Sequence, residues 1–154
     1  MLECEIEALR TIKHNNVLKC FDVIKESSHC YIITEFCNEG DLSGLIKKNK
    51  RFPEEEMVKY LKDIVSGFIE IGHKGFLHRD LKLANIFISN NTAKIADFGF
   101  AKKNKFASEK EKYNVGSPLY MSPEALKRNI YSLKNDIWSI GVMAYEMLHG
   151  ETPW

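Results

Sequence analysis

The segment that decides the fold is residues 78–99, which read HRDLKLANIFISNNTAKIADFG. Two short apolar runs lie within it, Ile86–Ile88 and Ala93–Ala96, and a polar Ser-Asn-Asn-Thr sequence separates them. Alternating short runs joined by such a turn sequence are typical of a β-hairpin. The sequence therefore predicts a small hairpin that brings together the polar residues on its two flanks.

Those flanks carry three acceptor side chains, Asp80, Asn85 and Asp97. The predicted hairpin would place them around one point. Two carboxylates and an amide suit phosphoryl transfer, because in that reaction the protein supplies positioning and charge neutralisation rather than covalent chemistry.

The motifs HRDLKLAN and DFG in this segment resemble the catalytic core of the eukaryotic protein kinases. The resemblance implies that Asp80 orients the substrate hydroxyl and accepts its proton, and that Asn85 and Asp97 hold Mg²⁺. Lys82, two residues after Asp80, is the lysine that marks serine/threonine kinases. The resemblance also implies ATP as the phosphate donor and a protein serine or threonine as the acceptor.

The resemblance extends over the chain and implies an α+β, protein-kinase-like fold that is incomplete. Residues 1–36 would form a remnant of the small lobe, with one helix and two strands. Residues 37–154 would form the first part of the mainly helical large lobe, including the catalytic loop at 78–85 and the activation segment at 97–124.

In the first part, apolar residues at helical spacing predict a helix that begins near Glu5 and ends before residues 14–16. Two β-rich runs follow, Val17–Ile24 and Cys30–Phe36, and we expect them to pair antiparallel. By resemblance, Glu5 corresponds to the glutamate that pairs with an ATP-positioning lysine. A solvated helix face is the alternative for Glu5.

Five residues correspond by resemblance to the nucleotide site. Thr34 takes the gatekeeper position, and Glu35 and Cys37 belong to the hinge whose backbone binds adenine. Asp41 could cap the next helix or reach the ribose hydroxyls, and one carboxylate can do either. Phe87 would form the apolar floor under adenine, with a plain core position as the alternative.

Two longer helices are expected in the second part. Pro53 followed by three glutamates is a helix start, and the predicted apolar face is the set Val58, Leu61, Ile64, Val65, Phe68 and Ile69. A second helix opens at Asp136 and is apolar almost all round, as expected for a helix buried on every side. By resemblance, Asp136 hydrogen-bonds the backbone of the His-Arg-Asp turn.

Residues 97–124 are polar and basic and show no regular period, and a connection of this length is usually functional or mobile. By resemblance it is the activation segment, which ends at Ser-Pro-Glu with Glu124. Phosphate on this segment would pair with Arg79 and Lys102. A solvated, unregulated lysine-rich loop is the alternative.

The candidate hydroxyls of this segment are Ser108, Tyr113 and Ser117. Tyr113 stands where the family often carries a phosphorylatable threonine. The activating phosphothreonine that is usual in the family is therefore not expected at this position. Ser117 corresponds to a residue beside the substrate site that contacts Asp80 or Lys82.

Composition limits the other classes of function. The 154-residue chain has a formal net charge of +1, which gives no electrostatic case for nucleic-acid or membrane binding. Its four cysteines show no paired metal-ligand spacing, so buried thiols in a reducing cytoplasm are favoured over a zinc site or a disulfide framework. No signal pattern or membrane-spanning run is visible.

The expected function is that of a serine/threonine protein kinase fragment. No glycine-rich loop or lysine strand precedes Glu5, so we expect the isolated chain to be weakly active or inactive. The motifs IADFGFAK and GSPLYMSPE are similar to those of the autophagy-initiating, uncoordinated-like kinases. The alternative is a catalytically deficient, kinase-like module that binds a regulatory or scaffold protein.

Overall fold

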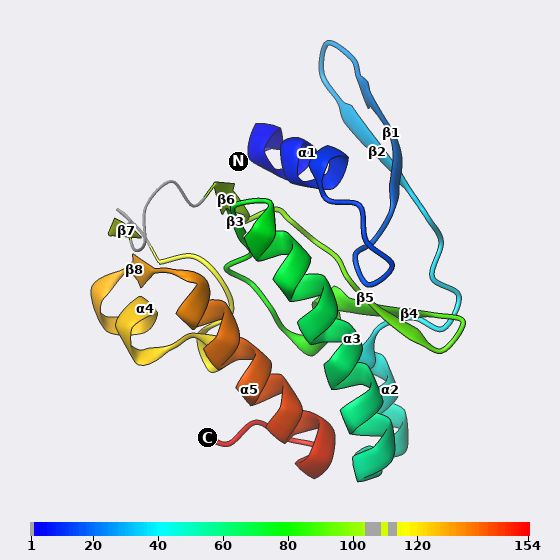
Figure 1. Ribbon diagram of the computed structural model, residues 1–154, viewed down its shortest axis with the longest axis vertical. Helices are drawn as coiled ribbons and strands as arrows, with labels where there is room; N and C mark the ends of the chain where they lie inside the picture. Colours follow the sequence, from blue (N-terminus) through cyan, green and yellow to red (C-terminus); the bar gives the residue numbers. More distant parts are fainter. Residues whose placement is uncertain (1, 104–108, 111–113) are drawn as a thin grey trace.

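The computed structural model describes residues 2–103, 109–110 and 114–154 (Figure 1). The helices are α1 (Leu2–Thr11), α2 (Leu42–Asn49), α3 (Glu54–His73), α4 (Pro123–Arg128) and α5 (Leu133–His149), with 3₁₀ turns η1 (Leu83–Asn85) and η2 (Pro118–Tyr120). The strands are β1 (Cys20–Lys25), β2 (Cys30–Thr34), β3 (Phe76–Leu77), β4 (Ile86–Ser89), β5 (Thr92–Ile95), β6 (Lys102–Lys103), β7 (Glu109–Lys110) and β8 (Ile130–Tyr131).

Small antiparallel sheets and helices are mixed along the chain. Among the described residues the strands form four two-stranded sheets, β1–β2, β3–β6, β4–β5 and β7–β8. Helix α1 and the β1–β2 hairpin lie at one end of the molecule, and α2, α3 and α5 lie at the other (Figure 1). This arrangement confirms the predicted α+β class.

The hairpin predicted between the two motifs is present as β4 and β5, with Ile86 opposite Ile95 and Ser89 opposite Thr92. Asn90 and Asn91 form its turn with φ angles of 50° and 58°. Two consecutive positive φ angles match the right-handed twist of the strands, and asparagine tolerates this backbone region better than most residues. The Asn-Asn sequence therefore explains why the connection is so short.

The strand boundaries near the N-terminus differ from the prediction. We predicted strands over Val17–Ile24 and Cys30–Phe36, but β1 begins at Cys20 and β2 ends at Thr34. The reason is that residues 17 and 18, just before β1, pair with the end of β5 instead of with β2. Val17 forms a parallel bridge with Ile95, and the Leu18 N–H donates to the Ile95 carbonyl at 2.8 Å.

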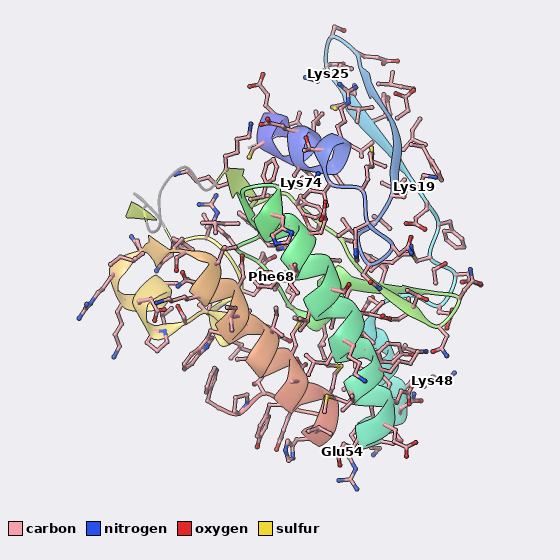
Figure 2. All side chains as sticks on the ribbon, in the orientation of Figure 1. Lys19, Lys25, Lys48, Glu54, Phe68 and Lys74 are labelled. Atoms are coloured by element: carbon pink, nitrogen blue, oxygen red, sulfur yellow. The ribbon has the colours of Figure 1, made fainter. Side chains whose placement is uncertain are left out.

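The buried face of α3 also differs from the prediction. Ile64 and Phe68 are buried as expected, but Val65 and Ile69 are 37% and 49% exposed. The observed inner face consists of Met57, Tyr60, Ile64, Gly67, Phe68 and Ile71, and it packs against β5 and α5. Figure 2 shows Phe68 on the side of α3 toward α5, whereas charged residues such as Lys48 and Glu54 lie at the periphery.

Gly67 explains why this side of α3, rather than the predicted one, faces the interior. A Cβ added at Gly67 would lie 2.5 Å from the Asn16 carbonyl oxygen and 3.2 Å from Ile95 Cδ1. The missing side chain lets the helix approach the backbone ahead of β1 and the end of β5. A hydrophobicity pattern ignores glycine, so the predicted face was placed too far round the helix.

Helix α5 begins with a capping box formed by Ser132 and Asn135 and ends at Gly150, whose φ is 84°. Met143 and Met147 are fully buried, but Ile137 and Trp138 on its other side are 55% and 40% exposed. Within the described residues this apolar helix is therefore not covered on every side, and it begins at Leu133 rather than at the predicted Asp136. Among all the residues that the structure describes, no helix is both long enough and apolar enough to cross a bilayer.

The close approach at Gly67 predicts opposite effects of alanine at two helical glycines. Alanine is favoured over glycine inside a helix by about 1 kcal/mol. Gly67→Ala should nevertheless lower the free energy of unfolding, by up to about 2 kcal/mol, because overpacking costs about 1–3 kcal/mol and exceeds the gain in helix propensity. Gly141→Ala on α5, where a Cβ meets nothing within 4 Å, should raise that free energy. Urea denaturation of both variants measures the difference, and a stabilising Gly67→Ala would contradict it.

Candidate active site

A closed polar network surrounds the Asp80 carboxylate, which is only 4% exposed. Its Oδ1 accepts a hydrogen bond from Ser117 Oγ at 2.8 Å, and its Oδ2 accepts from Lys82 Nζ at 2.8 Å and from Asn85 Nδ2 at 3.2 Å. Lys82 Nζ also donates to Ser117 Oγ at 2.9 Å. The structure thus brings together four predicted residues from two segments that are more than thirty positions apart.

Asn85 takes part in this network through its amide nitrogen. Its Nδ2 donates to the Asp80 backbone carbonyl at 2.9 Å as well as to the Asp80 carboxylate. No hydrogen bond within the described part of the chain uses its Oδ1. The Ala96 N–H donates to the Asn85 carbonyl at 2.9 Å, and this bond ties the residue before Asp97 to Asn85.

Asp97 lies in the left-handed backbone region, with a φ of 60°, and its side chain is exposed. Its Oδ1 accepts from the Gly99 N–H at 3.2 Å. A carboxylate and an amide oxygen are hard oxygen donors of the kind that Mg²⁺ takes, usually with few protein ligands and several waters or phosphate oxygens. The described residues contain no group of three His, Cys, Asp or Glu side chains that could hold a metal.

Glu5 on α1 belongs to the same region. Burial raises the pKa of Glu5, and the nearby Asp97 carboxylate raises this pKa further. No ion pair within the described residues reaches Glu5. Two carboxylates this close to each other make this side of the site suitable for a bound cation.

The turn that carries Asp80 is held by the buried side chain of Asp136 at the start of α5. Asp136 Oδ2 accepts from the His78 N–H and Oδ1 from the Arg79 N–H, each at 2.9 Å. Arg79 has a φ of 69°, which is strained for a residue with a side chain. Burial raises the pKa of Asp136, while its two N–H donors and the neighbouring His78 and Arg79 oppose that rise.

His78 is a site residue that the sequence did not single out. It is fully buried, its Nε2 lies 3.0 Å from the Ala96 carbonyl, and its Nδ1 accepts from the Asp80 N–H at 3.3 Å. These contacts fit one neutral tautomer, in which Nε2 carries the proton. Burial lowers the pKa of His78, and the Phe98 ring packs against the imidazole at 5.0 Å between centroids. His78 therefore connects the residue before Asp97 to Asp80.

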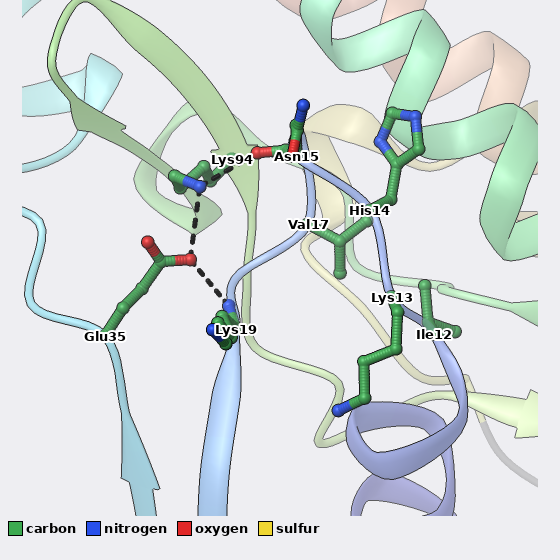
Figure 3. Close-up of a pocket in the computed structure, with 8 residues that line it drawn as sticks. All are labelled: Ile12, Lys13, His14, Asn15, Val17, Lys19, Glu35 and Lys94. Atoms are coloured by element: carbon green, nitrogen blue, oxygen red, sulfur yellow. Dashed lines mark hydrogen bonds and ion pairs between the residues drawn. The ribbon is translucent and has the colours of Figure 1, made fainter.

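The predicted hinge residues do not share one face. Thr34 ends β2 and is half-buried. The Glu35 carboxylate turns to a pocket formed mainly by residues 12–19, where it accepts from the Lys19 N–H at 2.7 Å and pairs with Lys94 at 3.2 Å (Figure 3). Cys37 is half-buried, and its amide makes no hydrogen bond with the described residues.

Asp41 and Phe87 are neighbours in the structure. They form an isolated antiparallel bridge, and Phe87 is half-buried on β4. Asp41 is the N-cap of α2, where its Oδ1 accepts from the Gly44 N–H at 2.8 Å. Capping, one of the two alternatives for Asp41, is thus observed.

The region after Asp97 is anchored at several points. Arg79 Nε donates to the Phe100 carbonyl at 2.7 Å, and Lys102 pairs with Leu77 in the β3–β6 sheet. Glu124 lies half-buried in the first turn of α4, which Ser122 caps. Ser108 and Tyr113, the other candidate hydroxyls, lie outside the described residues.

Comparison with known proteins gives a consistent match over nearly the whole chain. The family model described as "Protein kinase domain" matches residues 2–154. The chain is 39% identical to the serine/threonine-protein kinase atg1 of Dictyostelium discoideum, over 97% of this chain and 23% of that protein. It is 37% identical to the serine/threonine-protein kinase PLK4 of Danio rerio (97% and 16%) and 34% identical to the serine/threonine-protein kinase ULK1 of Homo sapiens (100% and 16%). The chain thus spans about a quarter or less of the length of these relatives.

The burial of His78 predicts a pH effect on stability. An unfolded histidine takes up a proton as the pH falls through about 6.5, but the buried imidazole does not, because burial lowers its pKa. The contribution of His78 is therefore fully present above pH 6.5 and is lost below it, by up to about 1.4 kcal/mol per pH unit. In His78→Gln, the difference in unfolding free energy between pH 7.5 and 5.5 should shrink by about 1 kcal/mol. Urea denaturation at the two pH values tests this, with exposed His73→Gln as the control; an unchanged difference in His78→Gln would refute it.

The two bonds to Asp136 predict a large loss of stability when one acceptor becomes a donor. In Asp136→Asn, the amide NH₂ would face a backbone N–H of the turn. We expect the free energy of unfolding to fall by about 2–3 kcal/mol, as for other broken buried charge networks. Asp22→Asn, an exposed change on β1, should have little effect in the same denaturation experiment. Equal stability of the two variants would show that Asp136 does not hold the turn.

Proposed function

The chain belongs to the protein kinase domain family, in its serine/threonine group, and has an incomplete protein-kinase-like fold; from this we propose that it is the catalytic centre of an ATP-dependent protein kinase. The single observation that supports this proposal most is the Asp80 network with Lys82, Asn85 and Ser117. In this network the buried Asp80 carboxylate can accept a proton, and the adjacent Lys82 ammonium group can bind a phosphate oxygen.

In the proposed reaction, a serine or threonine hydroxyl of a protein substrate donates a hydrogen bond to Asp80. As its oxygen forms a bond to the γ-phosphorus of ATP, the bond from that phosphorus to the bridging oxygen breaks, ADP leaves and the hydroxyl proton passes to Asp80. Lys82, 2.8 Å from Asp80 in the structure, would stabilise negative charge on the transferred phosphoryl group. A general base of this kind contributes about 10²–10⁴-fold to the rate.

Oxygen donors in the site fit the metal that the proposal requires. We assign Mg²⁺ to the Asp97 carboxylate and the free Asn85 Oδ1, beside the negative charge of Glu5. When bound, Mg²⁺ would neutralise charge on the phosphates of ATP. The free amide of Cys37 and the half-buried ring of Phe87 support an adenine position near the hinge.

Three residues near the proposed adenine position would make the other contacts with the nucleotide. We propose that Thr34 lies behind the adenine and that the backbone of Glu35 contacts it. Asp41 would reach the ribose with the carboxylate oxygen that does not cap α2. We propose that Glu5 pairs with a cation when nucleotide is bound and that the 154 residues alone transfer phosphate weakly or not at all; in support, no ion pair among the described residues supplies that cation.

For the cellular setting, we propose a cytoplasmic kinase of the autophagy-initiating group, with protein substrates and regulatory partners. The motif similarity and the atg1 and ULK1 relatives support the group, although the PLK4 relative is nearly as similar, at 37% against 39%. All four cysteines are free thiols, which fits a reducing compartment.

The role of Asp80 predicts a large effect of a nearly isosteric change. In the full-length protein, Asp80→Asn should lower kcat for a serine peptide by at least about 100-fold, because the amide cannot accept the proton. Asp22→Asn should keep normal turnover. Radiolabelled phosphate transfer measures both. Undiminished turnover in Asp80→Asn, or inactivity of the unmodified full-length protein, would favour the catalytically deficient binding module.

The role of Asp97 predicts a weaker metal site. Asp97→Asn should raise the Mg²⁺ concentration needed for half-maximal nucleotide binding by about tenfold or more, since the metal loses a charged ligand. Titration of a fluorescent ATP analogue with Mg²⁺ measures this concentration. If Asp97→Asn and the unmodified protein titrate alike, Asp97 is not a metal ligand.

A further inference from the structure

Tyr131 is a buried residue to which neither the sequence motifs nor the proposed reaction assigns a role. It lies in β8, between α4 and α5, and is 2% exposed. Its backbone pairs with Glu109 of β7, which belongs to the segment between Asp97 and Glu124. Its side chain contacts two further segments, at Val115 and at Arg79, and each of these segments also contains or contacts Asp80.

The first contact is made by the Tyr131 hydroxyl with the backbone of Val115. The hydroxyl accepts from the Val115 N–H at 2.8 Å and donates to the Val115 carbonyl at 2.9 Å. A single side-chain oxygen thus satisfies both polar backbone groups of one loop residue. This pair of bonds holds the loop two residues before Ser117.

The loop between Val115 and Ser117 is pressed against the catalytic loop. Gly116 has a φ of 105°, and any Cβ at this position would collide with the Arg79 carbonyl oxygen. The close approach lets the next residue, Ser117, reach Asp80 Oδ1 at 2.8 Å and Lys82 Nζ at 2.9 Å. The position of Val115 therefore limits where the Ser117 hydroxyl can lie.

The second contact is made by the Tyr131 ring with Arg79. The guanidinium carbon of Arg79 lies 5.5 Å from the ring centroid, within the range of a cation–π contact. Arg79 is the strained residue directly before Asp80. Tyr131 thus contacts, with one side chain, both of the segments whose polar groups meet at the proposed base.

We propose that Tyr131 is a positioning residue that holds the Ser117 loop against the catalytic loop and so keeps Ser117 on Asp80 and Lys82. This inference rests on the proposed kinase function and deepens it. In this role Tyr131 would act through Val115 and Ser117 rather than by contact with substrate or nucleotide. Loss of the two hydroxyl bonds should lower the rate of phosphate transfer by about tenfold.

The test uses Tyr131→Phe in the full-length protein, because this variant keeps the ring over Arg79 and removes only the hydroxyl. Turnover is measured with a serine peptide and divided by the number of nucleotide-binding sites, which counts folded molecules. We expect kcat/KM for the peptide to fall by about tenfold, with the KM for ATP within about twofold of normal. Tyr145→Phe, the same change at an exposed residue of α5, should leave both values unchanged.

A double-mutant cycle with Ser117→Ala separates positioning from a general structural role. If Tyr131 acts through Ser117, Tyr131→Phe should change kcat/KM by less than about twofold in the Ser117→Ala background. Independent, multiplicative losses would overturn the inference, as would normal activity of Tyr131→Phe or a Tyr131→Phe protein that binds no nucleotide. Asp80→Asn is assayed alongside: if it is as active as the unmodified protein, the proposed function fails rather than this inference.

Discussion

The structure around the site depends on one buried carboxylate and the two backbone N–H groups that it accepts. Asp136 lies in the first turn of α5 and holds the turn at His78 and Arg79, where the backbone enters the left-handed region at Arg79. A residue with a side chain adopts that conformation only where its surroundings determine it. Because Asp80 follows directly, the position of the proposed base is set by a helix that lies more than fifty residues further along the chain.

A chain of polar contacts extends from this anchor through an apolar interior. His78 joins Asp80 to Ala96, the Asn85 carbonyl accepts from the Ala96 N–H at the open end of the hairpin, and Ser117 adds a bond to Asp80 from a separate loop. Buried polar groups are costly unless each has a partner. The described contacts satisfy them while leaving two oxygen-bearing groups, Asn85 Oδ1 and the Asp97 carboxylate, available for a ligand. A site assembled in this way keeps its geometry before any ligand binds, which reduces the reorganisation required for reaction.

Sequence reasoning succeeded where the signal was local and failed where two segments had to meet. The β4–β5 hairpin followed from its apolar runs and the Asn-Asn turn, and the cap at Asp41 was among the stated alternatives. The inner face of α3 was misjudged because Gly67, which hydrophobicity ignores, sets the closest contact with Asn16. His78 and Tyr131 were missed because their partners, Ala96 and Val115, are backbone groups that no side-chain pattern reveals.

The sequence by itself determined the family, the α+β class and the identity of the chemical groups, since the motifs around Asp80, Asn85 and Asp97 are short and their spacing is set along the chain. Only the tertiary structure decided which of these groups touch. The contacts of Asp80 with Ser117, and of Asp136 with the turn at Arg79, join segments separated by tens of residues. Such contacts depend on how helices and loops pack, and that packing follows from the shapes of all the buried side chains together rather than from any one motif.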